Sequence, residues 1–222
     1  MPSAPVEGEP VPDDGSLPEK SAHAFGQRPF SVYVHVPYCA SRCGYCDFNT
    51  YTPAELRIQS SLDVISRDYI DLLVQEIETA ARVSNAQYVP TIFFGGGTPT
   101  LMQATDLGRV LDSIREHFTL TPDCEVTIEA NPDTVTPELL ASLRDIGINR
   151  ISMGMQSASP HVLSVLDRTH NPENISSAVE MARRRGAALW ALFAVGHVRR
   201  GAQGASAAGA SGCARRHRRR RD

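Results

Sequence analysis

The stretch FSVYVHVPYCASRCGYC (residues 30–46) runs from an apolar segment directly into three closely spaced cysteines. Its first part, FSVYVHV (30–36), is β-branched and aromatic and stops at Pro37, which predicts a buried strand. Three more short apolar segments with strand character follow, at TIFFG (91–95), EVTIEA (125–130) and RISMGMQ (150–156). We therefore expect four strands, of which the first leads into the cysteines.

Segments with helical periodicity lie between and after these strands. Thr105 and Asp106 are predicted to cap one helix, and Thr136-Pro137 to open the next. The expected helices cover residues 67–83, 105–118, 137–147, 160–167 and 173–186. A strand followed by a helix, repeated four times, predicts an α/β fold with a parallel sheet. A doubly wound sheet and a (β/α) barrel both fit this pattern.

In both architectures, functional residues gather at the carboxyl ends of the strands. Here those ends read PYCASRCGYC, GGGTPT, EANPDT and QSASP. All four are polar, glycine-rich or cysteine-bearing, so we expect a site at this edge of the sheet. The segment ALWALFAV (188–195) is a candidate fifth strand.

Cys39, Cys43 and Cys46 have the spacing Cys-x3-Cys-x2-Cys within one predicted loop. Three thiolates this close can bind a soft metal. On a [4Fe–4S] cluster they leave one iron open to a substrate or cofactor. A structural zinc site would need a fourth ligand, for which His35 and Cys124 are the candidates. A zinc site, or a buried trio of cysteines without metal, is the alternative to the cluster.

The CxxxCxxC spacing after the first strand of a β/α repeat resembles the radical S-adenosylmethionine (SAM) superfamily. GGGTPT (95–100) resembles that family's SAM-binding stretch, in which glycines let the backbone approach a ligand closely. In the family the open iron chelates SAM, and reduction cleaves SAM to methionine and a 5′-deoxyadenosyl radical. The resemblance implies an incomplete (β/α)6 barrel, a partial TIM barrel of parallel strands.

Four blocks resemble the oxygen-independent coproporphyrinogen III oxidase group and occur in its order: YVHVPYCASRCGYC, FFGGGTPT, TIEANPDT and SMGMQS. The oxidase proper carries a further cysteine two residues after the third cluster ligand, where this chain has Phe48. Cys46-Asp47-Phe48 instead resembles the heme chaperone (HemW) branch, which implies heme binding and transfer. Coproporphyrinogen III dehydrogenation in porphyrin biosynthesis is the alternative activity, and Phe48 disfavours it. The HNxxY heme motif of the branch is absent at His170-Asn171, so the chain resembles a truncated member.

The resemblance also assigns roles to single residues. Cys39, Cys43 and Cys46 would ligate the [4Fe–4S] cluster. Tyr33 would contact the SAM carboxylate, and Tyr45 would lie beside the adenine. The further SAM contacts that it implies are Gly96, Gly97, Thr98, Glu129, Gln156 and Arg168. It assigns no separate catalytic residue.

The implied partners are heme or a porphyrin, a reductant such as flavodoxin or ferredoxin, heme-receiving respiratory proteins and a second copy of the chain. Other candidate ligands have simpler interpretations from the sequence. We expect His35 to be a packed histidine, with a hydrogen bond next to the cluster as the alternative, and His170 to lie on the surface. Cys124 and Cys213 have no partner at ligand spacing, and we interpret them as incidental.

The composition divides the 222-residue chain into three parts. Residues 1–28 are proline-rich and acidic and are expected to be disordered, whereas residues 29–195 would form the radical SAM core. Residues 196–222 are rich in arginine, alanine and glycine and are also expected to be disordered. This segment is either a shifted reading frame in GC-rich DNA or a basic, nucleic-acid-binding tail. We favour the frame shift, because the repeat pattern stops midway, and do not expect nucleic-acid binding.

The chain carries a net charge of −3 and is 41% hydrophobic, which is typical of a globular protein. It has no apolar run long enough to span a membrane, and its N-terminus lacks the pattern of a signal peptide. Three of its five cysteines lie within eight residues, which is not the pattern of a secreted disulfide framework. We therefore expect a cytoplasmic protein.

Overall fold

The fold is a parallel sheet of five strands, seen in a computed structural model that describes residues 12–13, 16–18, 29–57, 62–84, 88–168, 170–184 and 188–192. The strands are β1 (Ser31–Val36), β2 (Tyr88–Gly96), β3 (Thr119–Ala130), β4 (Arg150–Gly154) and β5 (Ala188–Leu192). Residues 196–222 and most of residues 1–28 lie outside the described residues, so the disorder expected there stays a prediction.

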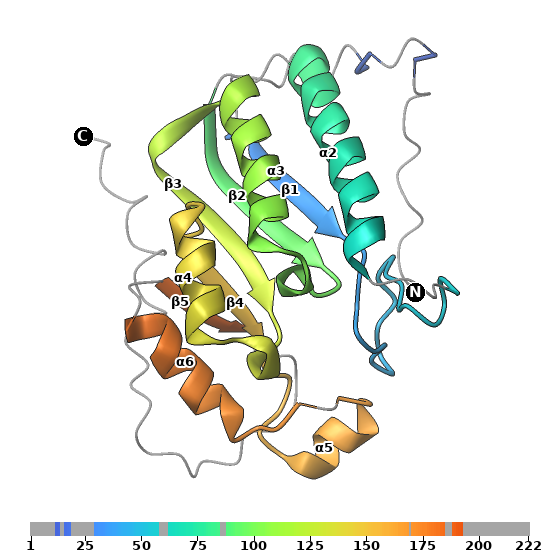
Figure 1. Cartoon of the computed structure of the whole chain (residues 1–222), viewed down its shortest axis with the longest axis vertical. Coiled ribbons are helices and arrows are strands. Elements are labelled where there is room, and N and C mark those ends of the chain that lie inside the picture. Colours follow the sequence, from blue (N-terminus) through green and yellow to red (C-terminus); the bar gives the residue numbers. More distant parts are fainter. Residues whose placement is uncertain are drawn as a thin grey trace, which may run out of the picture.

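Helices connect the strands. They are α2 (Leu62–Ser84), α3 (Ala104–His117), α4 (Pro137–Asp145), α5 (Pro160–Val165) and α6 (Asn174–Arg184), with short 3-10 turns at Pro99–Leu101 and Pro132–Thr134. The strand order is β1-β2-β3-β4-β5, so each new strand joins the same advancing edge of the sheet. Helices α2, α3, α4 and α6 lie together on one face of the sheet (Figure 1). A doubly wound sheet would reverse its order and cover both faces, so the fold is the partial barrel.

The boundaries of the elements differ from the expected ones most clearly at β3, α2 and α3. Strand β3 begins at Thr119, six residues earlier than expected. Helix α2 begins at Leu62, five residues earlier than expected. Helix α3 begins at Ala104 after Gln103, an extended residue without a side-chain cap, so the prediction that Thr105 and Asp106 cap this helix was wrong. The cap at Thr136 is confirmed, because its hydroxyl accepts a hydrogen bond from the Leu139 N–H at 3.1 Å. The candidate fifth strand is confirmed over Ala188–Leu192.

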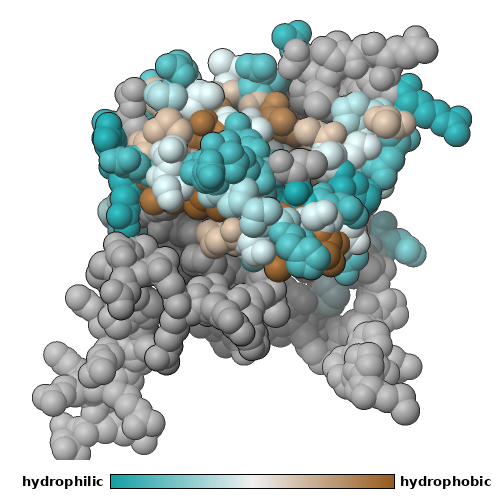
Figure 2. Space-filling model, turned by 90° about the horizontal axis from the view of Figure 1, so that it is seen from below, coloured by the Kyte–Doolittle hydropathy of each residue, from teal (hydrophilic) through white to brown (hydrophobic). Residues whose placement is uncertain are grey.

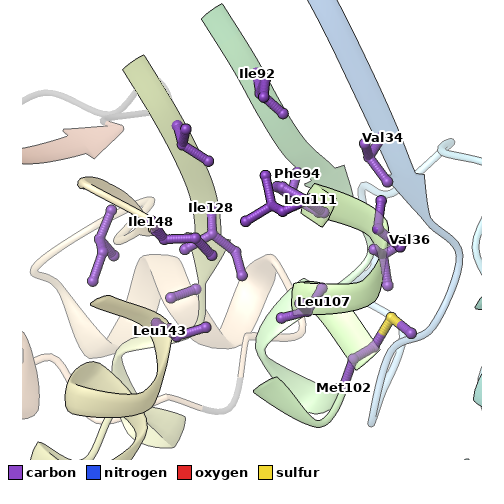
Figure 3. Close-up of a cluster of buried hydrophobic side chains, with 14 of the residues drawn as sticks. Val34, Val36, Ile92, Phe94, Met102, Leu107, Leu111, Ile128, Leu143 and Ile148 are labelled. Carbon is purple, nitrogen blue, oxygen red and sulfur yellow. The ribbon is translucent and has the colours of Figure 1, made fainter. Parts of the chain in front are cut away.

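The hydrophobic core lies between the sheet and helices α2, α3, α4 and α6. Because successive side chains of a strand point to opposite faces, every second strand residue enters this layer. Val36, Ile92, Phe94 and Ile128 are at most 1% exposed there. The residues that surround them include Val34, Leu107, Leu111, Leu143 and Ile148 (Figure 3). This core is what holds the carboxyl ends of the strands in one fixed arrangement.

The opposite face of the sheet, here called the inner face, differs sharply in composition. It carries Tyr33 and His35 on β1, Phe93 on β2, Glu129 on β3 and Ser152 on β4. Parallel sheets usually bury apolar residues on both faces, so polar and charged side chains on this one point to a binding site.

The surface of the described residues shows no large hydrophobic patch in the view of Figure 2. Seen from below, it mixes hydrophilic and hydrophobic residues, and the hydrophobic ones stand in small separate groups (Figure 2). Among the described helices, none has both the length and the apolar character needed to cross a membrane.

Candidate functional site

A pocket of about 290 Å³ opens where the cysteine-bearing loop meets the carboxyl ends of β2, β3 and β4. Of the eleven residues that the resemblance assigns to the cluster and to SAM, ten line it: Cys39, Cys43, Tyr45, Cys46, Gly96, Gly97, Thr98, Glu129, Gln156 and Arg168. The first and last of them, Cys39 and Arg168, are 129 positions apart in the sequence, and the parallel sheet brings all ten together.

The cysteines lie on a loop that we call the cysteine loop (residues 37–51). Backbone hydrogen bonds close its base, from Cys39 N to Tyr51 O at 3.0 Å and from Tyr51 N to Pro37 O at 2.7 Å. Near its centre Cys46 N donates to Cys43 O at 3.1 Å, which holds these two residues close. The loop is therefore shaped by its own backbone.

Two side chains fasten this loop to its surroundings. His35 Nε2 donates to the Asn49 carbonyl at 2.8 Å, because that oxygen can only accept. Its Nδ1 then accepts from the Tyr33 hydroxyl at 3.0 Å. Arg42 forms a two-pronged ion pair with Glu55 at 2.8 and 3.1 Å. This guanidinium and the Thr52 N–H hold the pKa of the Glu55 carboxyl at about 2.

The three cysteines of the loop are free thiols of intermediate exposure. Burial raises the pKa of the Cys39 thiol, while hydrogen bonds from Thr50 and Thr98 partly oppose this shift. Thr50 is 3% exposed, and its hydroxyl lies 3.9 Å from Cys46 Sγ. Within the described ranges, no three His, Cys, Asp or Glu side chains are arranged to hold a single metal ion.

The residues present fit a cluster better than a structural zinc ion. Both candidates for a fourth zinc ligand are engaged or remote. His35 uses its two nitrogens in the hydrogen bonds to Tyr33 and Asn49. Cys124 lies six residues before the end of β3, roughly 20 Å along the strand. The pocket thus offers three thiols and open space beside them, the donor set that leaves one iron of a [4Fe–4S] cluster free.

The glycine-rich stretch forms the wall of the pocket next to the cysteine loop. Gly97 N donates to Val36 O and Thr98 N to Tyr38 O, each at 2.7 Å, so this stretch crosses the end of β1. A Cβ on Gly97 would overlap the Tyr38 carbonyl and lie 3.0 Å from Cys39 Sγ. Gly96 has a φ of +112°, and a Cβ there would lie 2.7 Å from the His35 ring. The close approach of these two segments therefore requires glycine at both positions.

Glu129 contributes a carboxylate to the floor of the pocket. Its Oε2 accepts a hydrogen bond from Gly96 N at 3.1 Å, which ties β3 to the glycine-rich stretch. Burial raises the pKa of Glu129, and the Gly96 hydrogen bond and the nearby His35 oppose this shift. A partly desolvated carboxylate suits a ligand that carries a positive group.

Gln156 and Arg168 bring buried polar atoms that have no hydrogen-bond partner among the described residues, namely Gln156 Oε1 and Arg168 Nε. Gln156 also has a φ of +53°, a conformation that is uncommon for a residue with a side chain. Buried groups of this kind are normally satisfied, so a ligand with a donor for the amide oxygen and an acceptor for the guanidinium fits here. The ammonium and carboxylate of an amino acid supply both.

The two predicted tyrosines occupy different places. Tyr45 lines the pocket, where partial burial raises its pKa. Tyr33 does not line the pocket. It lies on the inner face of β1, its ring stacks on Phe93 at 6.1 Å between centroids, and burial and Glu129 raise its pKa. In this structure its hydroxyl donates a hydrogen bond to His35 Nδ1, and His35 in turn binds the Asn49 carbonyl of the cysteine loop.

His170 was expected on the surface, and this prediction was wrong. Its side chain is 4% exposed, and burial together with the nearby Arg168 lowers its pKa. The cause is tertiary packing, because Asp133 accepts hydrogen bonds from Asn171 N and Asn174 Nδ2 and so draws this segment onto the turn after β3. The sequence reasoning also missed pocket residues at these strand ends and loops: Asn131, Thr134, Ser152 and Asp167. Asn131 and Thr134 belong to the polar strand end EANPDT, which was their only signal.

Comparison of the sequence with known protein families identifies the family to which this chain is similar. The model of the Radical SAM superfamily matches residues 33–197. The heme chaperone HemW of Mycobacterium tuberculosis is 47% identical over 160 residues, which is 72% of this chain and 40% of that protein. HemW of Escherichia coli is 35% identical over 158 residues, 71% of this chain and 40% of that protein.

The solved structures give a similar result. The coproporphyrinogen III oxidase HemN of Escherichia coli, described as a radical SAM enzyme, matches with a TM-score of 0.65 and 30% identity, over 75% of this chain and 37% of that chain. The chain thus spans about 40% of the length of the curated relatives named above.

Proposed function

Because the chain belongs to the radical SAM superfamily, we propose that residues 29–195 form the [4Fe–4S]- and SAM-binding part of a heme-handling protein of the HemW type. The observation that carries this proposal is the pocket, in which three cysteines meet a glycine-rich wall, a carboxylate and two unsatisfied polar side chains.

Within the proposed site each group has a distinct task. The thiolates of Cys39, Cys43 and Cys46 hold the cluster. When bound, the cluster supplies the electron for reductive cleavage of SAM. The glycine-rich stretch lets its backbone approach the methionine end of SAM, and Glu129 balances the positive groups of SAM. Gln156 and Arg168 have a buried acceptor and a buried donor free for the amino-acid part.

Anaerobic reconstitution with iron and sulfide tests the cluster. We expect about four irons and four sulfides per chain and a brown chromophore. Cys43→Ala should abolish the chromophore, whereas the matched variant Cys124→Ala should retain it, because Cys124 lies outside the pocket. One zinc per chain without acid-labile sulfide, or equal loading in the two variants, would overturn the proposal.

The heme chaperone branch is the finer part of the proposal. It is supported by the similarity to HemW over 160 residues and by Phe48, which lines the pocket mouth where the oxidase resemblance requires cysteine. The similarity to the HemN structure keeps coproporphyrinogen III dehydrogenation as the second candidate. Both candidates use a tetrapyrrole, so the assay must separate binding from conversion.

Two assays on the reconstituted chain separate these candidates. With the reduced cluster, SAM and coproporphyrinogen III under anaerobic conditions, we expect no decarboxylated product. Hemin titration tests whether heme binds to this part of the protein without the HNxxY motif, and a heme-handling role requires a saturable shift of the hemin absorption band. Decarboxylation would favour the dehydrogenase, and the absence of saturable hemin binding would contradict a heme-handling role for this part of the protein.

The remaining partners follow from the same proposal. A low-potential donor such as flavodoxin or ferredoxin would reduce the cluster, respiratory proteins would receive the heme, and two copies of the chain would pair. We place these events in the cytoplasm.

A further inference from the structure

Arg168 makes a contact that the proposed SAM site does not require. Its Nη1 donates to Cys43 Sγ at 3.4 Å, and its Nη2 donates to the Gly154 carbonyl at 2.8 Å. The guanidinium therefore connects the end of β4 to Cys43, a proposed cluster ligand that lies 125 positions before Arg168 in the sequence. Its third nitrogen group, Nε, is the one left for a ligand of the pocket.

The loop around Arg168 is shaped to make this contact. Gly44, next to Cys43, donates its N–H to the Leu166 carbonyl at 3.1 Å. A Cβ on Gly44 would overlap the Asp167 carboxylate, so glycine permits the approach. Asp167 in turn adopts a φ of +49°, and Arg168 N donates back to Leu163 O at 2.9 Å. Two loops thus fix the guanidinium beside the thiol.

A guanidinium in this place has a definite electrostatic effect. Arginine stays protonated at all relevant pH values, and the contact with Cys43 is partly buried, so solvent screens it weakly. Hydrogen bonds to ligand sulfurs and the local charge set the reduction potential of an iron–sulfur cluster. A positive charge favours the reduced state, which carries one more electron.

We propose that Arg168 is a positioning residue that holds Cys43 in place and raises the reduction potential of the cluster bound there. The inference rests on the proposed function, because it requires the cluster. The step it affects is the transfer of one electron from an external low-potential donor to the oxidised cluster, with no bond made or broken and no proton moved. Removing the guanidinium makes this step less favourable.

The test is an EPR-monitored redox titration of the reconstituted full chain with dithionite and mediators. At the midpoint potential of the wild type, Arg168→Gln should lower the ratio of reduced to oxidised cluster at least tenfold, which is about 59 mV for one electron. Arg168→Lys should lower it less, because an ammonium keeps the charge but cannot make both contacts. Arg109→Gln is the matched control, since it removes an arginine of α3 from a surface pair with Asp71 on α2 and should leave the ratio unchanged.

The outcomes are distinguishable. If the wild type takes up no iron and sulfide, the proposed function fails. If Arg168→Gln carries a full cluster with the wild-type potential, the proposed function stands and the inference is overturned. If Arg168→Gln loads too little cluster to titrate, Arg168→Lys decides, and a potential equal to that of the wild type overturns the inference. A loss of loading with an unchanged potential would indicate a structural role alone.

Discussion

Glu129 shows what one residue contributes to this site and what it costs the fold. Burial raises its pKa above the ordinary 4.5, so the folded chain binds this proton more tightly than the unfolded chain does. Stability must therefore fall as the pH rises from 4.5 to the folded pKa, because the carboxylate loses its proton while it is still partly desolvated. A ligand whose positive groups require the negative charge of Glu129 would explain why a carboxylate occupies this partly buried position.

Replacing Glu129 with glutamine should remove this pH dependence. Glutamine keeps an oxygen that can accept from Gly96 N but has no proton to lose. We expect the free energy of unfolding of Glu129→Gln, relative to wild type, to rise between about pH 4 and pH 7. Urea denaturation at both pH values measures this difference. Glu116→Gln, an exposed position on α3, is the control. Equal slopes in Glu129→Gln and wild type would contradict the account.

Single residues also mark the limit of prediction from the sequence. The three cysteines and the glycine-rich stretch could be predicted, because their spacing is local. The burial of His170 could not, since it depends on Asp133 and on how the segment after α5 folds back. The contact of Arg168 with Cys43 is likewise set by two loops that the sequence does not relate.

At the level of elements, the N-termini of α3 and α4 lead us to expect opposite effects on stability when Thr105 and Thr136 are replaced with alanine. Thr136→Ala should destabilise the chain by about 1 kcal/mol, because it removes the acceptor for Leu139 N at the start of α4. Thr105→Ala should leave stability unchanged or raise it by up to about 0.7 kcal/mol, because Thr105 is exposed within α3 and alanine favours helix. Urea denaturation of both variants measures the free energy of unfolding. An equal decrease in the two variants would contradict this account and indicate that Thr105 does cap α3.

The glycine-rich stretch after β2 gives a second prediction at this scale. Gly97→Ala should push the Tyr38 carbonyl away and displace Cys39, because the new Cβ has no room against backbone. We expect cluster loading to fall by at least half and stability to drop by roughly 1–3 kcal/mol. Iron and sulfide analysis after reconstitution measures the loading.

The control for this variant is Gly108→Ala. There the new Cβ would meet only the Ile146 side chain, at 3.2 Å, and alanine is the better helix former. Its loading should match the wild type. Full loading of Gly97→Ala would show that the close approach of the two segments is not needed.

For the whole molecule, the alternation of strand and helix predicted the parallel sheet. The residue periodicity located every strand, although β3 begins six residues before its expected start. It left open whether the sheet was doubly wound or a barrel, because local patterns do not say which face a helix will cover. The observed strand order decided this, with the covering helices on one face. That choice frees the inner face, where the polar strand ends converge on the pocket.

The central claim is that this pocket binds SAM beside a [4Fe–4S] cluster, and the EPR spectrum of the reduced, reconstituted chain tests it most directly. Saturating SAM should change the spectrum, because the amino and carboxylate groups would bind the open iron, and Glu129, Gln156 and Arg168 would hold this same amino-acid end of SAM. Adenosine, which lacks both groups, should leave the spectrum unchanged. A spectrum that saturating SAM does not alter, in a chain with a full complement of iron and sulfide, would contradict the claim.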